Sequence, residues 1–167
     1  MTQLKVIHGD IITIACDIIV NAANNGLQGG GGVDGAIHQA GGPAIMEECR
    51  EIGYCPTGSA VITSAGDLQA DYIIHTVGPV WMGGTRGEAE KLQSCYEESI
   101  ELAVEYRADS LAFPNISTGV YKYPKDLAAP LAIKTVKEML KKQGTEMEIF
   151  FVCFDAENAE LYKKLIE

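Results

Sequence analysis

The sequence predicts a three-layer α/β/α sandwich, because two patterns follow one another along the chain. Six apolar segments of strand length are nearly continuous rather than alternating with polar residues, which is typical of strands covered on both faces. Amphipathic segments lie between them and indicate helices packed on a sheet. The 167 residues, 47% of them hydrophobic, suffice for one core, so we expect a single domain over residues 1–167.

The expected elements follow these two patterns in chain order. The strands are Leu4–Ile7, Ile18–Ala22, Ala60–Thr63, Tyr72–Val77, Ser110–Pro114 and Ile149–Phe154. Helices are expected at Val33–Ala40, Ala44–Ile52, Glu88–Tyr106 and Leu127–Lys142, and from Ala156 to the end of the chain. Asp126 and Asp155 stand where N-caps are expected, because a short acidic side chain accepts a backbone N–H there.

The two long helices have the clearest periodicity. One face of the first, at steps of three and four, consists of Leu92, Cys95, Tyr96, Ser99, Ala103 and Tyr106. The second places Ala128, Leu131, Ala132, Thr135 and Met139 in the same way. We expect both faces to pack on the sheet.

Composition and charge exclude several classes of partner. The net charge is −10, and no Lys or Arg lies between Val6 and Cys49, so we do not expect nucleic acid as the main partner. No apolar run approaches the roughly 18 residues of a membrane helix, so we expect no membrane association. Met1–Ile7 has neither a basic region nor a cleavage site typical of a signal peptide. We expect a cytoplasmic monomer.

The cysteines and histidines give no sign of a disulfide framework or a metal site. An odd number of cysteines, five, without a CxxC pair favours free and mostly buried thiols. The three histidines, His8, His38 and His75, are scattered and lack the spacing of metal ligands. We therefore expect no metal and no cofactor.

A glycine-rich segment follows the second predicted strand, at the edge where α/β sheets bind ligands. Asn24 is followed by four consecutive glycines, Gly29–Gly32, and then by the start of a helix. Four glycines are costly in conformational entropy but let the backbone approach a ligand closely. The positive end of the helix faces the same point, which predicts an anion site. A flexible surface loop is the alternative.

Three further strand ends carry candidate residues. Ser117, Thr118 and Gly119 follow the fifth strand, and Tyr121 offers an aromatic face to a sugar. Phe154 ends the last strand, where its ring is suited to stacking on a base, although such a residue is more often part of a core. Asp10 follows the first strand and can accept a hydrogen bond from the amine of adenine; a helix cap is the equally reasonable alternative.

These loops together favour a nucleoside diphosphate attached to a further sugar. Two amide-rich loops suit a diphosphate, and an aromatic ring with an acid suits adenine. Asn24 and Asp34 suit the hydroxyl groups of a sugar. Because neither glycine loop contains a basic residue, backbone dipoles would hold the phosphates.

In these motifs the whole chain resembles the macro domain family, and within it the MacroD-type ADP-ribosyl hydrolases. The motifs, in order, are Gly9–Ile11, Asn21–Asn24, Gly29–His38, Cys55–Ala60, Tyr72–Pro79 and Ile116–Tyr121. The segment Gly29–His38 is the most specific, and it separates the chain from macro domains that only bind. The resemblance implies a mixed central sheet of about six strands.

The resemblance also implies a role for each site residue. Asp10 would contact adenine with Ile11 beside it, and Phe154 would pack near the base or its ribose. Gly31, Gly32 and Val33, with Ser117, Thr118, Gly119, Val120 and Tyr121, would wrap the diphosphate. Asn24 and Asp34 would address the distal ribose and carry out catalysis. The implied ligands and partners are ADP-ribose, O-acetyl-ADP-ribose and mono-ADP-ribosylated proteins, without a metal.

Two positions differ from the usual family pattern. Lys122 stands where the family often has glycine, and Asn115 where it often has a small or apolar residue. These differences bear on the rate and the fine specificity of the reaction more than on the identity of the ligand.

The expected reaction is hydrolysis of an ester at the distal ribose. Asp34 is the first candidate to orient or deprotonate the attacking water, and a substrate phosphate oxygen is the alternative proton acceptor, since the diphosphate disfavours a second negative charge nearby. We expect Asn24 and Asp34 to act chiefly by orienting ribose and water.

Three other functions are consistent with parts of the sequence. A non-catalytic reader of ADP-ribose needs the same diphosphate loops but not Asp34. A dinucleotide-binding oxidoreductase is less favoured, because its glycines would follow the first strand directly. A protein-interaction role leaves no recognisable mark in a sequence.

Overall fold

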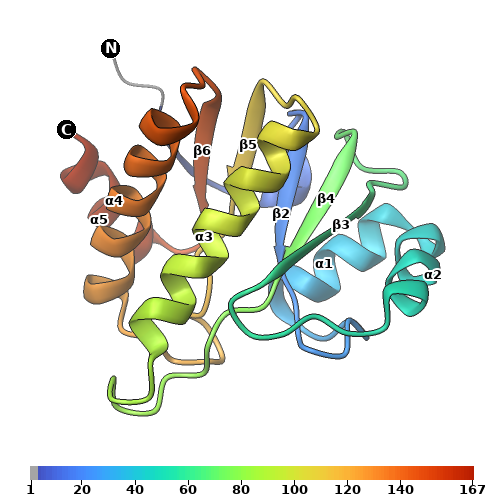
Figure 1. Cartoon of the computed structure of the whole chain (residues 1–167), viewed down its shortest axis with the longest axis horizontal. Helices are drawn as coiled ribbons and strands as arrows, with labels where there is room; N and C mark the ends of the chain where they lie inside the picture. The colour runs from blue at the N-terminus through green and yellow to red at the C-terminus, as the bar shows by residue number, and fades with distance from the viewer. Residues whose placement is uncertain (1–3) are drawn as a thin grey trace.

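A mixed six-stranded sheet with helices on both faces forms the molecule (Figure 1). The structure, a computed structural model, describes residues 4–167, so residues 1–3 of the expected domain lie outside it. The strands are β1 (Leu4–His8), β2 (Ile18–Ala22), β3 (Ala60–Ser64), β4 (Tyr72–Thr76), β5 (Ser110–Phe113) and β6 (Glu148–Cys153). Their spatial order is β1-β6-β5-β2-β4-β3. Only β3, paired with β4, is antiparallel to its neighbour.

The helices divide into two layers. They are the short η1 (Ile11–Thr13), then α1 (Gly32–Gly41), α2 (Pro43–Ile52), α3 (Glu88–Glu105), α4 (Lys125–Gln143) and α5 (Ala156–Ile166). α3, α4 and α5 share one hydrophobic core with one face of the sheet, and α1, α2 and η1 share another with the opposite face. The predicted three-layer α/β/α sandwich is confirmed.

The continuous apolar strands are explained by these two cores. Successive side chains of a strand point to opposite faces. In β2, Ile18 and Val20 lie in the core beneath α3–α5, while Ile19 lies in the core beneath α1 and α2. All three side chains are at most 1% exposed, so a strand in the middle of this sheet has no solvent-facing side.

One of the two predicted helix caps is correct and the other is wrong. The Asp155 side chain caps α5 by accepting the backbone N–H of Asn158 at 2.7 Å. Asp126 does not cap α4, because the helix begins one residue earlier, at Lys125. Pro124 precedes it with extended geometry (φ −59°, ψ 127°), and its carbonyl accepts the first helical N–H groups. Asp126 lies in the first turn, where its negative charge interacts favourably with the positive end of the helix dipole.

The five cysteines are free, as predicted, and four of them are buried. Burial raises the pKa of Cys16, Cys49, Cys55 and Cys95 to about 11, which keeps these groups as neutral thiols. Within residues 4–167, no helix is long and apolar enough to cross a membrane.

Candidate functional site at the carboxyl edge of the sheet

Four predicted ligand-binding segments lie side by side at one edge of the sheet. The strands β1, β6, β5 and β2 are neighbours in this order and run parallel, so their carboxyl ends share an edge. Asp10 follows β1, Phe154 follows β6, residues 115–121 follow β5, and residues 23–31 follow β2. Segments more than a hundred residues apart in the sequence thereby meet.

The glycine segment borders open space at the N-terminus of α1. Gly31 caps the helix, and Gly32, its first residue, has φ 58°, a left-handed conformation that favours glycine. Apart from their chain neighbours and the adjacent helix backbone, no atom of the described residues lies within 4 Å of the point where a Cβ of either residue would stand. The N–H groups of the first helical turn have no partner within the helix. The backbone therefore offers an anion site without any basic side chain.

Gly35 holds this segment against the helix. A Cβ atom on Gly35 would overlap the carbonyl oxygen of Gly30. The Cβ position of Gly30 in turn lies 3.6 Å from Oδ2 of Asp34 and 3.7 Å from Nδ2 of Asn24. The close packing of two glycines thus brings both predicted catalytic side chains to the same stretch of backbone.

Asn24 is also a structural brace for the glycine segment. Its Nδ2 donates to the carbonyl oxygen of Gly29 at 2.8 Å, and its Oδ1 accepts the backbone N–H of Gln28 at 3.1 Å. Any contact of Asn24 with a sugar therefore comes in addition to two bonds that shape the loop.

Asp34 lies in the first turn of α1 and is 6% exposed. Its Oδ1 accepts a hydrogen bond from Nδ2 of Asn21 at 2.9 Å, and Nε2 of His38 lies 3.3 Å from the same oxygen. Its Oδ2 is the oxygen on the side of Gly30. The two oxygens of this carboxylate therefore have different surroundings.

The loop after β5 places its predicted residues in different environments. Ser117 is 8% exposed with φ 68°, and its Oγ has no hydrogen-bond partner within residues 4–167. Thr118 donates its hydroxyl to the carbonyl oxygen of Asn115 at 3.3 Å. Gly119 borders open space, and Val120 is 89% exposed.

The end of this loop is fixed by the segment after β4. The carbonyl oxygen of Tyr121 accepts the backbone N–H of Trp81 at 2.8 Å. Lys122 is exposed with φ 61°. A left-handed backbone at this position accounts for the glycine that is usual in the family. Asn115, the other unusual residue, donates its side-chain amide to Sγ of Cys153 at 3.6 Å.

The residues predicted to contact the base are partly engaged in the fold. Asp10 caps η1, with its Oδ1 accepting the backbone N–H of Ile12 at 3.2 Å, which is the alternative considered for it. Ile11 is 3% exposed and belongs to the core beneath α1. Phe154 follows the last residue of β6 and is 75% exposed, so its ring is not part of the core.

Sequence reasoning missed a buried polar group behind Asp34. Asn21 on β2 and His75 on β4 are both 0% exposed, and Thr63 on β3 is 3% exposed. Each follows two or more apolar residues within its strand, which is the signal that could have revealed them, because a buried polar residue is far more informative than a buried apolar one. Burial, together with nearby His38, lowers the pKa of His75 to about 3.

The sequence suggested that the histidines are scattered. In the fold, however, His38 and His75 lie close to each other and to Cys49. One possible ligand atom from each lies within 4.8 Å of the others. Both ring nitrogens of His75, however, already face polar partners, Asn21 at 3.0 Å and Thr63 at 2.9 Å. A metal at His75 would have to displace one of them. The expectation that no metal is needed remains a prediction.

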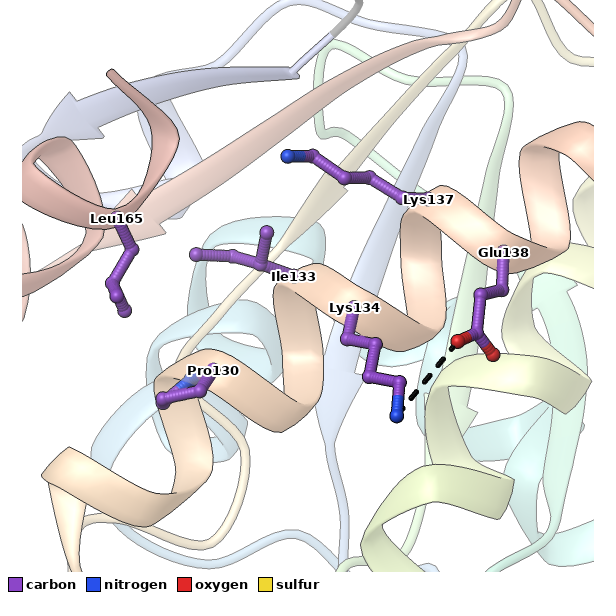
Figure 2. A pocket seen from close by; sticks show the side chains of 6 residues that line it. All are labelled: Pro130, Ile133, Lys134, Lys137, Glu138 and Leu165. Atoms are coloured by element: carbon purple, nitrogen blue, oxygen red, sulfur yellow. Dashed lines mark ion pairs between the residues drawn. The ribbon is translucent and has the colours of Figure 1, made fainter.

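Two surface hollows have neither Asn24 nor Asp34 in their lining. One, of about 420 Å³, lies between α4 and α5, and none of its lining residues is a predicted site residue (Figure 2). They are Pro130, Ile133, Lys134, Lys137, Glu138 and Leu165. The other, of about 590 Å³, is lined by Thr118, Gly119 and the segment Lys122–Pro124 after β5, and by residues of α4 and α5.

Comparisons with curated proteins give close relatives of full length. A macro domain-containing protein of Listeria monocytogenes is 58% identical over 170 residues, which covers 98% of this chain and 97% of the relative. A protein of Escherichia coli named O-acetyl-ADP-ribose deacetylase is 52% identical over 169 residues, covering 99% and 96%.

Solved structures agree with the sequence relatives. The macrodomain of Oceanobacillus iheyensis, solved with ADP, has a TM-score of 0.90 at 40% identity and covers 96% of this chain and 88% of that one. The Trypanosoma brucei macrodomain in complex with ADP-ribose has a TM-score of 0.93 at 35% identity, covering 99% and 69%. The macro domain family model itself matches residues 20–132. The two helical layers and the glycine segment before α1 agree with this match, and the chain belongs to the macro domain family.

Proposed function

We propose that this chain binds ADP-ribose and hydrolyses the acetyl ester of O-acetyl-ADP-ribose. The observation that carries the proposal is the order of the segments along the sheet edge. Asp10 and Phe154 lie at β1 and β6, the Ser117–Tyr121 loop at β5, and the glycine segment with Asp34 at β2. This is the order of adenine, diphosphate and distal ribose along ADP-ribose.

The relatives support the same ligand and reaction. The Escherichia coli relative is named for deacetylation of O-acetyl-ADP-ribose, and the structural neighbours were solved with ADP and ADP-ribose. At 52% identity over almost the full length, we extend that hydrolase activity to this chain.

The chemistry that we assign to the site is hydrolysis by positioning. The backbone of Gly31–Val33 and of the loop after β5 holds the diphosphate through N–H groups. Asn24 and Asp34 orient the distal ribose and the attacking water, so that proximity supplies most of the rate enhancement. The proton goes either to Asp34 or to a phosphate oxygen of the substrate.

We extend the proposal to mono-ADP-ribosylated proteins modified on acidic side chains. Their bond to the distal ribose is also an acyl ester. Where the ester oxygen is on the anomeric carbon, attack of water on that carbon breaks the C–O bond and releases a carboxylate from either substrate. A monomeric state and a cytoplasmic location complete the proposal.

A turnover assay with O-acetyl-ADP-ribose tests the central claim. We expect release of acetate and ADP-ribose, whereas a non-catalytic reader would bind ADP-ribose without turnover. Calorimetry should show that ADP-ribose binds, and a thermal shift should show a raised Tm, since a ligand selective for the folded state stabilises it. Absence of binding at millimolar ADP-ribose would remove the proposal.

NAD separates the hydrolase from an oxidoreductase. Its nicotinamide occupies the anomeric carbon of the distal ribose, where the group to be cleaved must fit, so NAD should bind more weakly than ADP-ribose. Equal or tighter binding of NAD in the same calorimetric experiment would favour the oxidoreductase.

Linkage selectivity tests the assigned chemistry. Acyl esters should be cleaved, because a carboxylate leaves without strong acid assistance. Serine ethers and arginine N-glycosides should resist, since we assign no strong general acid to the distal ribose. Release of ADP-ribose from a serine-linked peptide at a comparable rate would reveal a strong general acid at the distal ribose.

A further inference from the structure

A row of buried polar side chains connects the edge strand β3 to Asp34. Thr63 on β3, His75 on β4 and Asn21 on β2 lie on three adjacent strands, and each bonds to the next. Asn21 then reaches Asp34 at the start of α1. Burying polar groups costs free energy unless they are paired, and Oδ1 of Asn21 has no hydrogen-bond partner among residues 4–167, so an apolar row would hold these strands together at least as well.

The direction of every hydrogen bond in the row follows from Asp34. An ionised carboxylate only accepts, so the group of Asn21 that faces Oδ1 at 2.9 Å is its NH₂. The second N–H of that group points at Nδ1 of His75 at 3.0 Å, which must therefore be the unprotonated nitrogen. Nε2 of His75 then carries the proton and donates to Oγ1 of Thr63 at 2.9 Å. Thr63 donates its own hydroxyl to the carbonyl oxygen of Ser64 at 2.9 Å.

We propose that Asn21 and His75 are positioning residues that fix the orientation of the Asp34 carboxylate. Asn21 holds Oδ1 from the sheet side, and His75 prevents the Asn21 amide from rotating by accepting its other N–H. Oδ2 is then the oxygen left on the side of Gly30, whose Cβ position also lies 3.7 Å from Nδ2 of Asn24. This inference rests on the proposed function, because it assigns to Asp34 the carboxylate that meets ribose and water.

The row requires a neutral His75, and deep burial of the imidazole meets this requirement. A protonated His75 would carry hydrogen on both nitrogens and would turn a donor toward the NH₂ group of Asn21. Burial keeps the imidazole neutral, with its pKa lowered to about 3, so the acceptor at Nδ1 persists at neutral pH.

A paired substitution at position 75 tests the proposal. His75→Asn can place an amide oxygen where Nδ1 stands and still accept from Asn21. His75→Gln reaches the position of Nε2, bonds to Thr63 and leaves the Asn21 N–H unpaired. We expect His75→Gln to lower kcat for O-acetyl-ADP-ribose about 10-fold with KM within about 3-fold, and His75→Asn to retain most of kcat, because misplacement of a reacting group by about 1 Å can cost up to 100-fold.

Asn21→Asp is the second arm, and Asn158→Asp is its matched control. Asn158 is 1% exposed and donates its side-chain amide to Asp155 at 3.1 Å, so it has the same kind of bond without contact to Asp34. Both variants should lower Tm, but only Asn21→Asp should lower kcat, by about 10-fold to 100-fold. Wild-type kcat in folded Asn21→Asp or His75→Gln, or equal impairment of His75→Asn and His75→Gln, would overturn the positioning role.

The tautomer of His75 gives a readout that does not depend on turnover. ¹⁵N NMR of the imidazole should show a proton on Nε2 and none on Nδ1 in the wild type, and Asn21→Asp should move the proton to Nδ1. A wild-type proton on Nδ1 would contradict the row. If the tautomer is as expected but Asp34→Ala keeps the full rate, the proposed role of Asp34 has failed rather than the orientation of its carboxylate.

Discussion

At the scale of single residues, Asp34 and Asn24 both lie near Gly30 but differ in the hydrogen bonds that their side chains make. Asp34 bonds to the sheet through Oδ1, whereas Asn24 uses both polar atoms of its side chain to shape the loop that it belongs to. Removing either side chain therefore has different consequences for structure, although both are proposed to serve the same step.

Asp34→Ala should lower turnover of O-acetyl-ADP-ribose far more than it weakens ADP-ribose binding. Losing a well-placed catalytic group costs on the order of 100-fold or more in rate, while the adenine and diphosphate contacts come from other segments. Steady-state kinetics beside calorimetry on the same preparation, with circular dichroism to confirm folding, measures this. A folded variant with the parent rate would remove Asp34 from the mechanism.

Asn24→Ala should impair both turnover and binding. The substitution deletes the bonds to Gly29 and Gln28 along with any contact to the ribose, so the glycine segment loses its brace. We expect a loss in kcat together with a weaker Kd for ADP-ribose, in contrast to Asp34→Ala. An unchanged Kd would mean that other contacts alone maintain the loop.

Phe154→Ala should weaken binding with little effect on the rate of the bound substrate. The ring is 75% exposed next to the carboxyl end of β6, so its removal leaves no cavity in the core. Loss of base stacking should cost about 1–3 kcal/mol in affinity, on the scale measured for nucleic-acid bases. Calorimetry with ADP-ribose and with ribose 5-phosphate separates the base contact from the rest: only the first ligand should bind more weakly to the variant.

At the scale of elements, the start of α1 is the part of the fold that depends most on particular residues. Gly31 ends the loop, Gly32 adopts a left-handed conformation and Gly35 packs on the carbonyl of Gly30. The same turn carries Asp34 and the free N–H groups of the helix, so the shape of this turn and the proposed anion site are inseparable.

Gly35→Ala should destabilise the protein and weaken ADP-ribose binding. Alanine gains about 1 kcal/mol in helix propensity, but its Cβ would overlap the Gly30 carbonyl, and such overpacking costs about 1–3 kcal/mol. Gly119→Ala is the comparison: its Cβ meets no atom within 4 Å, so Tm should stay unchanged while binding falls if the loop after β5 wraps the diphosphate. An unchanged Tm for Gly35→Ala would show that the turn adapts.

At the scale of the whole molecule, the buried His75 couples the stability of the sheet to pH. Its pKa is lowered from 6.5 to about 3 by burial and by His38, so the folded protein does not take up this proton where the unfolded chain does. The unfolded state therefore binds more protons between pH 6.5 and pH 3, and folding stability falls as pH falls through this window. Above pH 6.5 the residue adds no pH dependence.

Chemical denaturation as a function of pH should detect this. For one proton the expected slope is about 1.4 kcal/mol per pH unit, and it should start near pH 6.5. A second loss of folding stability should follow below pH 4.5, where Glu88 takes up a proton in the unfolded chain. Burial alone would raise the pKa of Glu88, but hydrogen bonds from the backbone N–H groups of Met82, Gly84 and Arg86 lower it to about 2. His75→Asn should flatten only the first window. An equal slope in the variant would place the titration elsewhere.

The two layers and the strands could be predicted from the sequence because they depend on local periodicity. Continuous apolar strands and amphipathic helices follow from which side chains must leave water, and β2 has the predicted boundaries Ile18–Ala22. The errors lie at element ends. Phe154 falls just beyond β6, and Pro124 rather than Asp126 precedes α4, because a hydrogen bond or a proline decides an end where periodicity does not.

The sequence by itself determined the fold class, the glycine segment and the loops that carry the candidate residues. Only the tertiary structure decided the order of those loops along the edge and the polar row behind Asp34. The order depends on which strands pair, since β6, from the end of the chain, lies between β1 and β5. The row joins side chains that are far apart in the sequence, such as Asn21 and His75, which are 54 positions apart. Asn21 and Thr63 both reach His75 because β2 and β3 each pair with β4. Local sequence cannot encode such contacts, because backbone pairing across the sheet creates them.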